Sequence, residues 1–480
     1  MVHAIYVLVF AIAVPLVHLA LGATMDQAVG NPLSGQPSWL IGVGSVLAAS
    51  GLVLILASIA WLGRIGRGLP ISSSPPRRLV TAGPYHWSRH PIYLGAVLAF
   101  LGGSLLLGSF WNAVLAGPLL GFFYFTYACG VEEPILLSRF GQQYRTYQEK
   151  TALVVEFPLR RHSYKLITGA LTLLSAAINR PKISRMGDHI FFWDYGIWTG
   201  VGATLGLTAM EYVLLVQGLP VPKAAWTVAA VATAGLLGSR MMWRTGVAVR
   251  NGVEFGHTAG TVGFVSWGVL AGLLIVLPLL ALATGQSAYM LFDATFPALM
   301  IAHIFGRTGC AFYGCCYGKE TTTRLRLCYQ HPALKAVREK KVHPEALRPV
   351  QLISALYGGV IAALVFGLWC RLPLPVGLPA ALTAAMYGLF RLGEEWLRSQ
   401  SVLLWGLVSP AQLAALALAL LGLGHLASIP PGGGSATYAA LGEVAFAPVL
   451  QQIHPLLLAA SGLITAFVLS YHYRAIGRWK

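Results

Sequence analysis

Repeated apolar runs of about 20 residues constrain the fold of this chain more than any other feature. A helix of that length spans the roughly 30 Å hydrocarbon core of a bilayer. The predicted spans are residues 4–23, 38–62, 92–108, 111–129, 189–217, 225–243, 261–283, 289–306, 350–370, 376–397, 402–425 and 447–472. The pattern predicts an all-α, polytopic transmembrane protein with about 12 spans, four in the first part of the chain and eight in the second.

The composition agrees with this prediction, because 56% of the residues are hydrophobic and only 10% are charged. The mean hydropathy of +0.68 excludes an ordinary soluble enzyme. The net charge of +17 would suggest nucleic acid in a soluble chain. Here the cations are better explained by the enrichment of Lys and Arg in cytoplasmic loops, and we expect no nucleic acid partner.

The distribution of these cations predicts an orientation. With the N-terminus in the cytoplasm, nearly all of the 33 Lys and Arg residues fall in cytoplasmic segments, with Lys223 and Arg371 on the other side. The polar segment 319–348 is then cytoplasmic. The loops of the second part of the chain would lie on the opposite side of the membrane only if residues 166–178 crossed the bilayer.

Charge and hydropathy also divide the chain into domains. Residues 1–160 form one predicted domain and residues 186–480 another, with a polar headpiece at 319–349. Between them, 161–185 combine cations at both ends with a 13-residue apolar stretch, LITGALTLLSAAI. This stretch is short for a crossing, so we expect a basic interfacial linker.

The first domain carries TAGPYHWSRHPIYLG and, further on, VEEPILLSRFGQQYRTYQ. Gly83-Pro84 predicts a turn, and Arg89-His90-Pro91 places donors where a helix begins. Glu132 and Glu133 add two carboxylates. Such a set suits a zwitterionic ligand, although interfacial loops leading into a Pro-started helix explain the residues equally well.

Taken together, these motifs resemble the isoprenylcysteine carboxyl methyltransferase and phospholipid methyltransferase superfamily. The resemblance covers about residues 40–158 and implies S-adenosylmethionine at the membrane face, with Glu132 in a catalytic role. The methyl acceptor is left open as a lipid carboxylate, an amine or a thiol. The residues implied to bind the cofactor are Tyr85, Arg89, His90, Pro91, Tyr93, Gly95 and Glu133.

The second domain holds FGRTGCAFYGCCYG, which contains Cys310, Cys315 and Cys316. The C-x4-C-C spacing is unlike that of compact zinc sites, so the sequence favours packing of small apolar thiols and no metal is expected. Arg307 stands at the end of an apolar span, where a charge is costly unless it meets a cavity or a partner.

Two further motifs accompany Arg307. In MYGLFRLGEEWLRS, Arg391, Glu395 and Arg398 share one helical face, and Glu394 can pair with Arg398. A salt-bridged helix end explains this stretch without any ligand. The segments FFWDYGIWTG and GSRMMW add Tyr195-Gly196 and Arg240.

These motifs resemble prolipoprotein diacylglyceryl transferase over about residues 186–425. The resemblance adds Pro349-Val350-Gln351-Leu352 and implies transfer of a diacylglyceryl group from phosphatidylglycerol to a thiol. It implies catalytic roles for Tyr195, Arg307, Arg391 and Glu395. The residues implied to bind phospholipid are Arg240, Arg307, Gly318 and Arg398.

The chain departs from that family's pattern at polar positions. Trp267 aligns with the usual histidine, Cys310 and Cys315 with polar residues of the signature, and Ser354 with a glutamate. Tyr195, Tyr317 or Glu395 would then have to accept the proton of a thiol. The family site opens outside the cytoplasm, opposite to the orientation that the cations predict.

The sequence thus predicts a bifunctional lipid-modifying enzyme of the bacterial plasma membrane, which methylates one lipid or lipidated substrate and transfers diacylglyceryl to another. Its partners are membrane lipids and a lipoprotein or another lipidated acceptor. An active methyltransferase joined to a non-catalytic phospholipid-binding scaffold is the alternative. A transporter is a remote one, because the two parts lack matching repeats.

Overall fold

The structure is a computed structural model, and its helices group into two compact units. Unit 1 comprises Met1–Ile167 and Gly388–Gly434, and unit 2 comprises Thr168–Tyr387 and Ser435–Lys480. Each unit is described below by itself. The residues that the structure describes are 12–35, 37–68, 76–153, 160–186, 189–252, 266–321, 323, 325–340, 345–399, 408–430, 436–444 and 446–471.

Eight helices in the described part of the chain are long and apolar enough to cross a membrane. They coincide with eight of the predicted spans and confirm a multi-pass, predominantly helical membrane protein. These helices are Ser38–Gly66, Asn112–Lys150, Trp193–Val216, Val221–Val249, Trp267–Thr284, Ala288–Tyr313, Val350–Arg371 and Pro410–Ser428.

The remaining four predicted spans are not confirmed as crossings. Two of them correspond to the shorter apolar helices α5 (Pro91–Leu106) and α18 (Pro455–Tyr471). Helix α15 (Leu378–Leu397) carries the charged motif in its second half. The first 11 residues of the chain lie outside the described residues, and helix α2 (Val14–Val29) follows them.

Two small antiparallel sheets supplement the helices. Strand β1 (Ile183–Met186) pairs with β2 (His189–Phe192), and β3 (Leu327–Tyr329) pairs with β4 (Glu345–Leu347). The second sheet belongs to the headpiece predicted at 319–349, which also contains the short helix α13 (Lys335–Lys340).

Unit 1 is built on close contact between α3 (Ser38–Trp61) and α5. A Cβ added at Gly102 would lie 2.2 Å from the backbone nitrogen of Ala48, and one at Gly51 would lie 2.4 Å from that of Ala99. Small residues let helices approach in this way in lipid. Leu56, on α3, is 67% exposed, as expected for a lipid-facing side chain.

The rest of unit 1 continues through α6 (Gly117–Tyr127) and α7 (Glu133–Lys150), joined by the π-helical turn η4 (Ala128–Glu132). Gly141 interrupts α7 with a φ of +50°, a conformation that glycine adopts readily. Helix α16 (Pro410–Ser428) packs against α2 in the same unit.

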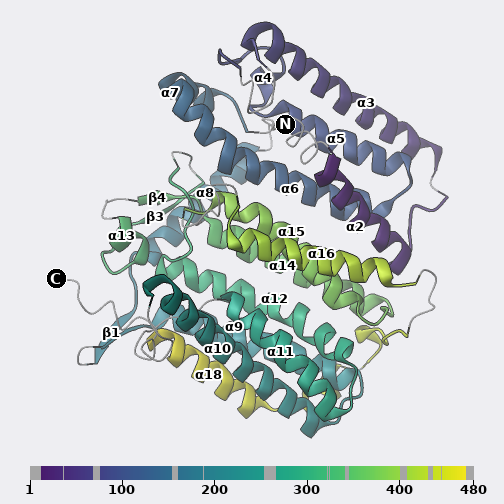
Figure 1. Cartoon of the computed structure of the whole chain (residues 1–480), viewed down its shortest axis with the longest axis vertical. Coiled ribbons are helices and arrows are strands. Elements are labelled where there is room, and N and C mark those ends of the chain that lie inside the picture. The colour runs from purple at the N-terminus through teal and green to yellow at the C-terminus, as the bar shows by residue number, and fades with distance from the viewer. Residues whose placement is uncertain are drawn as a thin grey trace. The chain divides into compact units, whose positions relative to one another are not determined.

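Unit 2 is arranged around α12 (Ala288–Tyr313), which contacts α9 (Trp193–Val216), α11 (Ser266–Thr284) and α14 (Val350–Arg371), as Figure 1 shows. Helix α10 (Val221–Asn251) packs on α11, and α18 packs on α9. The end of α12 that leads to the headpiece therefore lies among several helices.

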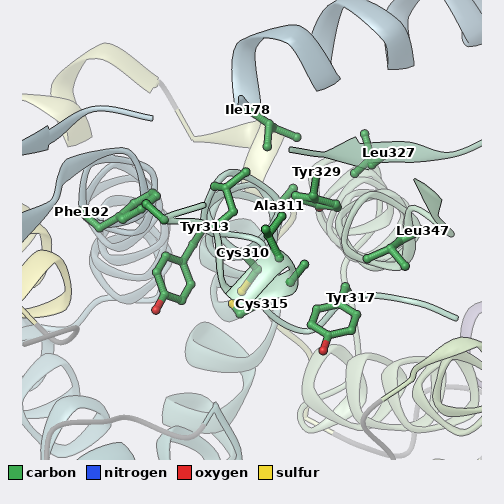
Figure 2. Close-up of a cluster of buried hydrophobic side chains, with 14 residues drawn as sticks. Ile178, Phe192, Cys310, Ala311, Tyr313, Cys315, Tyr317, Leu327, Tyr329 and Leu347 are labelled. Carbon is green, nitrogen blue, oxygen red and sulfur yellow. The ribbon is translucent and has the colours of Figure 1, made fainter. Parts of the chain in front are cut away.

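The headpiece and the end of α12 share one apolar core, drawn in Figure 2, where Cys310 and Cys315 lie among Tyr313, Tyr329 and Leu347. Helix α8 (Arg160–Ile178) covers part of this core with its last turns. Just beyond α8, the Asn179 side chain donates to the carbonyl of Cys328 over 2.8 Å. This packing fixes the end of α8 on the headpiece, while its interfacial position in the membrane stays a prediction.

A buried carboxylate holds the opposite end of unit 2. Asp293 is 0% exposed and accepts hydrogen bonds from the backbone nitrogens of Gly377 at 2.6 Å and Ala380 at 2.8 Å. The Tyr438 hydroxyl donates to the same carboxylate over 2.8 Å. Asp293 thereby satisfies N–H groups at the start of α15 that a helix leaves unpaired.

We therefore expect Asp293→Ala to lower the free energy of unfolding by on the order of 3 kcal/mol, because three buried donors lose their acceptor. Thermal unfolding of the purified protein in detergent measures this loss. Glu443→Ala, an exposed acidic residue near Tyr438, is the matched control and should have little effect. Equal stability of the two variants would contradict this role for Asp293.

Candidate functional site

The first site lies in unit 1, where the chain turns from the short helix α4 (Pro84–Trp87) into α5. Gly83 has a φ of +63°, and a Cβ there would lie 2.4 Å from the Trp61 ring, so the turn requires glycine. Pro91 begins α5, where its missing N–H has no cost. This turn sets Arg89 and His90 just before the helix.

Two acidic residues meet these donors. Arg89 Nη2 lies 2.8 Å from Glu133 Oε1, with side chains 7% and 4% exposed. His90 Nδ1 lies 3.1 Å from Glu132 Oε2, and the Tyr93 hydroxyl donates to Glu132 Oε1 over 2.5 Å. Glu133 is thus neutralised inside the protein, whereas the Glu132 side chain keeps 28% of its surface exposed.

Aromatic rings surround the same carboxylates. The ring of Tyr93 stacks on Tyr124 with centroids 5.0 Å apart and on His90 at 5.9 Å, and Tyr127 approaches it edge-on at 6.3 Å. Aromatic faces attract cations, and a carboxylate beside them adds to that attraction. The set therefore fits a ligand that carries a positive charge.

The end of α7 closes back onto the turn. Tyr147 donates to the carbonyl of Tyr85 over 2.5 Å, and Arg89 Nη1 donates to the carbonyl of Gln148 over 3.0 Å. Burial, with a smaller effect of the Glu132 charge, raises the pKa of Tyr85 well above its ordinary value. Tyr85 therefore stays a neutral phenol.

Seven of the eight residues predicted for this site share this neighbourhood. Gly95 differs, since a Cβ there would lie 2.7 Å from the carbonyl oxygen of Gly51. Its position indicates a packing role at the crossing of α5 with α3. A cofactor role for Gly95 remains a prediction only.

A residue that sequence reasoning missed is Trp396, in the second half of α15. Its ring meets Phe123 at 4.9 Å and Tyr127 at 5.1 Å, and its carbonyl oxygen would be 2.4 Å from a Cβ at Gly130. No local signal reveals this contact, because more than 250 residues separate the partners. The charged motif of α15 therefore shares unit 1 with the residues of the first site.

The charged motif itself forms a buried network. Arg391 Nη1 lies 2.5 Å from Glu395 Oε2 and 3.5 Å from Glu394 Oε1, and Arg398 Nη1 lies 3.5 Å from the same Glu394 oxygen. The predicted pairing of Glu394 with Arg398 is confirmed. Two arginines balance two glutamates here, so the network is neutral before any ligand arrives.

In unit 2, the last turns of α12 bring together other predicted residues. Arg307 is 6% exposed, and Tyr195 lies against this helix end, with its ring 5.9 Å from that of Tyr313. The backbone oxygen of Tyr195 would lie 3.1 Å from a Cβ at Gly309. Arg391, Glu395 and Arg398 belong to unit 1 and are not placed relative to these residues.

Further cations stand where the headpiece begins. A Cβ at Gly318 would lie 2.6 Å from the carbonyl oxygen of Arg348, so the backbone at Gly318 packs closely against the backbone at Arg348. Burial and the neighbouring charge of Arg348 lower the pKa of Lys319. Arg240 lies on α10, two residues after Gly238, where α10 crosses α11 at Gly268.

The three cysteines of this region converge. The sulfur atoms of Cys310, Cys315 and Cys316 all lie within 4.8 Å of one another. Cys310 and Cys315 belong to the apolar core of Figure 2, while Cys316 is partly exposed. Hydrogen bonds with the two neighbouring thiols, together with burial, raise the pKa of Cys315 well above its ordinary value.

A second group that the sequence did not reveal centres on His303, one turn before Arg307. His303 Nε2 lies 3.0 Å from Ser354 Oγ, which donates to the Tyr357 hydroxyl over 2.9 Å. The His303 ring meets Tyr387 edge-on at 5.4 Å, and Trp267 meets Tyr387 at 6.4 Å. Ser354 and Trp267, two departures from the family pattern, thus belong to one polar and aromatic group.

Comparison with known proteins assigns each of the two sets of motifs to a protein family. The pattern of the prolipoprotein diacylglyceryl transferase family matches residues 183–428, and that of the phospholipid methyltransferase family matches residues 39–143. Trp396 and the charged network of α15 fall inside the first match.

Individual relatives show the same division. A phosphatidylglycerol–prolipoprotein diacylglyceryl transferase of Hydrogenovibrio crunogenus is 27% identical over 292 residues, which are 58% of this chain and 93% of that protein. A second one, from Clostridium perfringens, is 27% identical over 34% of this chain and 60% of its own length. A protein-S-isoprenylcysteine O-methyltransferase of Tribolium castaneum is 32% identical over 25% of this chain and 42% of that protein.

The buried ion pair of the first site gives a testable prediction. Arg89→Met should lower the free energy of unfolding by about 3–5 kcal/mol, because Glu133 would be left as an uncompensated buried charge. Unfolding in detergent, followed by circular dichroism, measures the change. Arg145→Met, at an exposed position of α7, is the control. A loss no larger than in the control would show that the pair adds nothing to stability.

Proposed function

Because the chain belongs to the prolipoprotein diacylglyceryl transferase family and joins that domain to a phospholipid methyltransferase domain, we propose that it is a bifunctional lipid-modifying enzyme. The methyltransferase domain transfers a methyl group from S-adenosylmethionine to a lipid or lipidated acceptor. The transferase domain moves diacylglyceryl from phosphatidylglycerol to a thiol. Its bacterial relatives support a bacterial plasma membrane as its location.

The group of Tyr93, His90 and Glu132 carries the first half of this proposal. S-adenosylmethionine supplies a methyl group on a positively charged sulfur, and displacement at that carbon needs positioning more than acid–base help. Glu132 and the stacked rings would hold the cation, while the ion pair with Arg89 fixes the position of Glu133 beside them. The partial exposure of Glu132 leaves a side from which a ligand can enter.

The buried arginine at the end of α12 supports the second half. A guanidinium in a site of low dielectric is well suited to stabilise a phosphate leaving group. Arg307 is buried near the end of α12, and Tyr195 of α9 lies against the same end of that helix. The cations Lys319 and Arg348 at the start of the headpiece extend the positive region.

The alternative is an active methyltransferase with a rear domain that binds phospholipid without turning it over. The departures at Trp267 and Ser354 favour it, because tryptophan replaces the histidine that could accept the proton of a thiol and serine replaces a carboxylate. Binding without release of glycerol phosphate distinguishes this alternative from the main proposal.

For the methyltransferase, we expect Glu132→Gln to weaken S-adenosylmethionine binding about tenfold, since a charged contact to the sulfonium is lost. Calorimetric titration measures the affinity, and transfer of labelled methyl groups to a membrane lipid extract measures the activity. Glu149→Gln, at an exposed position of α7, should change neither. Wild-type protein that neither binds the cofactor nor labels lipid would refute this activity.

For the diacylglyceryl transferase, purified protein is given phosphatidylglycerol and a lipoprotein-signal peptide with one cysteine. Release of glycerol phosphate should fall at least 100-fold in Arg307→Ala, because removal of such a charge contact costs about 3 kcal/mol or more in the transition state. Arg371→Ala, at an exposed position of α14, is the control. Lipid binding without release by the wild-type protein would favour the scaffold alternative.

A further inference from the structure

The cysteine cluster begins with the way α12 ends. Gly314 has a φ of +74°, its nitrogen bonds to the carbonyl of Ala311 at 3.2 Å, and the Cys315 nitrogen bonds to the carbonyl of Cys310 at 3.1 Å. This is the Schellman pattern, in which the chain folds back over the last turn of a helix. The turn returns Cys315 to Cys310 although four residues separate them.

The third thiol is brought in by an unusual backbone conformation. Cys316 has a φ of +54°, one of two positive values among non-glycine residues in the described part of the chain. A non-glycine residue in this region costs on the order of 1–2 kcal/mol and persists only where surrounding contacts impose it. Here the result is a group of three sulfur atoms within 4.8 Å of one another.

This spacing is close to what a metal needs. Zinc–sulfur bonds of ~2.3 Å place tetrahedral thiolates roughly 3.8 Å apart, so small rotamer changes would bring the three sulfurs to one ion. Among the described His, Cys, Asp and Glu residues, the cluster contains these three ligands and no fourth. Three protein ligands with an open fourth position are typical of catalytic zinc, whereas structural zinc is closed by four.

Charge and surroundings agree with a bound cation. Three thiolates and one Zn²⁺ carry a net charge of about −1. Arg307 lies one turn before Cys310 on the same helix face and can offset that charge.

We propose that Cys310, Cys315 and Cys316 bind a zinc ion whose fourth position takes the acceptor thiol. This inference rests on the proposed diacylglyceryl transfer and supplies what that reaction lacks here, because Trp267 stands where the family pattern has histidine. A thiol that coordinates zinc is deprotonated by the metal itself, so no basic side chain is required.

The reaction is then fully balanced. The acceptor thiol would lose its proton to solvent as its sulfur binds zinc. That sulfur would donate an electron pair to the phosphate-bearing carbon of the diacylglyceryl group, so that the carbon–sulfur bond forms while the bond between this carbon and the phosphate oxygen breaks. Glycerol phosphate leaves with the electron pair of that bond, and Arg307 stabilises its charge.

The first test measures metal rather than activity. Full-length protein purified under reducing conditions should contain about one zinc per chain. The cobalt-substituted protein should show thiolate-to-cobalt charge transfer and the visible bands of a tetrahedral site. Cys316→Ser, at a partly exposed position, should lose both signals, whereas Cys328→Ser in the headpiece and Cys370→Ser at an exposed position should keep them.

Four results would overturn the site. They are absence of zinc in the wild-type protein, an octahedral cobalt spectrum, unchanged signals in Cys316→Ser, and a disulfide between two of the three cysteines that survives purification under reducing conditions. Alkylation of the wild-type protein is a check that needs no variant: Cys316 should be protected by zinc and react after chelation, with Cys370 reactive in both states.

Measurement of glycerol phosphate release then tests the zinc site separately from the diacylglyceryl transfer on which the proposal rests. Removal of zinc should lower glycerol phosphate release at least tenfold, and added zinc should restore it. Release that is unchanged without zinc would refute the role of the metal and leave the transferase standing. Tight zinc binding with no release under any condition would refute the transferase and leave the metal site standing.

Discussion

The cost of placing a charge inside a protein that lies in lipid governs this structure. A charged side chain at that depth must be neutralised by a protein partner or by a ligand. Arg89 with Glu133, and Arg391 and Arg398 with Glu394 and Glu395, are neutralised within the chain. The charged groups of the first site and of the α15 network are therefore held by contacts that do not depend on a ligand.

The same constraint explains why the two sites differ in chemistry. In unit 1, carboxylates and stacked aromatic rings surround the turn before α5, an arrangement that attracts a cation. In unit 2, arginine and lysine dominate the end of α12 and the start of the headpiece, an arrangement that attracts a phosphate. The grouping of residues 388–434 with the first unit places part of the transferase match beside the methyltransferase helices.

Much of the fold could be predicted from hydropathy, because a long apolar run has few other ways to satisfy its backbone. Length alone was a weaker guide for α5 and α18, which are shorter than a typical span. The domain boundaries predicted near residues 160 and 186 stay a prediction. A domain boundary drawn along the sequence cannot show that the second half of α15 packs against α6. Trp396 makes this contact with residues that are far away in the sequence.

The sites were predictable only where their residues belong to motifs. Arg89-His90 and Glu132-Glu133 stand in two such motifs, and a hairpin of helices brings the carboxylates to the turn. The cysteines looked unlike a metal site because their spacing was read along the chain, while the turn at Gly314 brings them together in space. His303 and Ser354 are 51 residues apart, and neither belongs to a motif by itself.

The proposed diacylglyceryl transfer depends most on Arg307 as the side chain that holds the phosphate of an anionic lipid. Native mass spectrometry of the protein, released from bilayers that contain phosphatidylglycerol and phosphatidylcholine in equal amounts, tests this role directly. Wild-type protein should retain phosphatidylglycerol selectively, and Arg307→Met should lose that selectivity. Equal retention of the two lipids by the wild-type protein, or selectivity that survives in the variant, would contradict it.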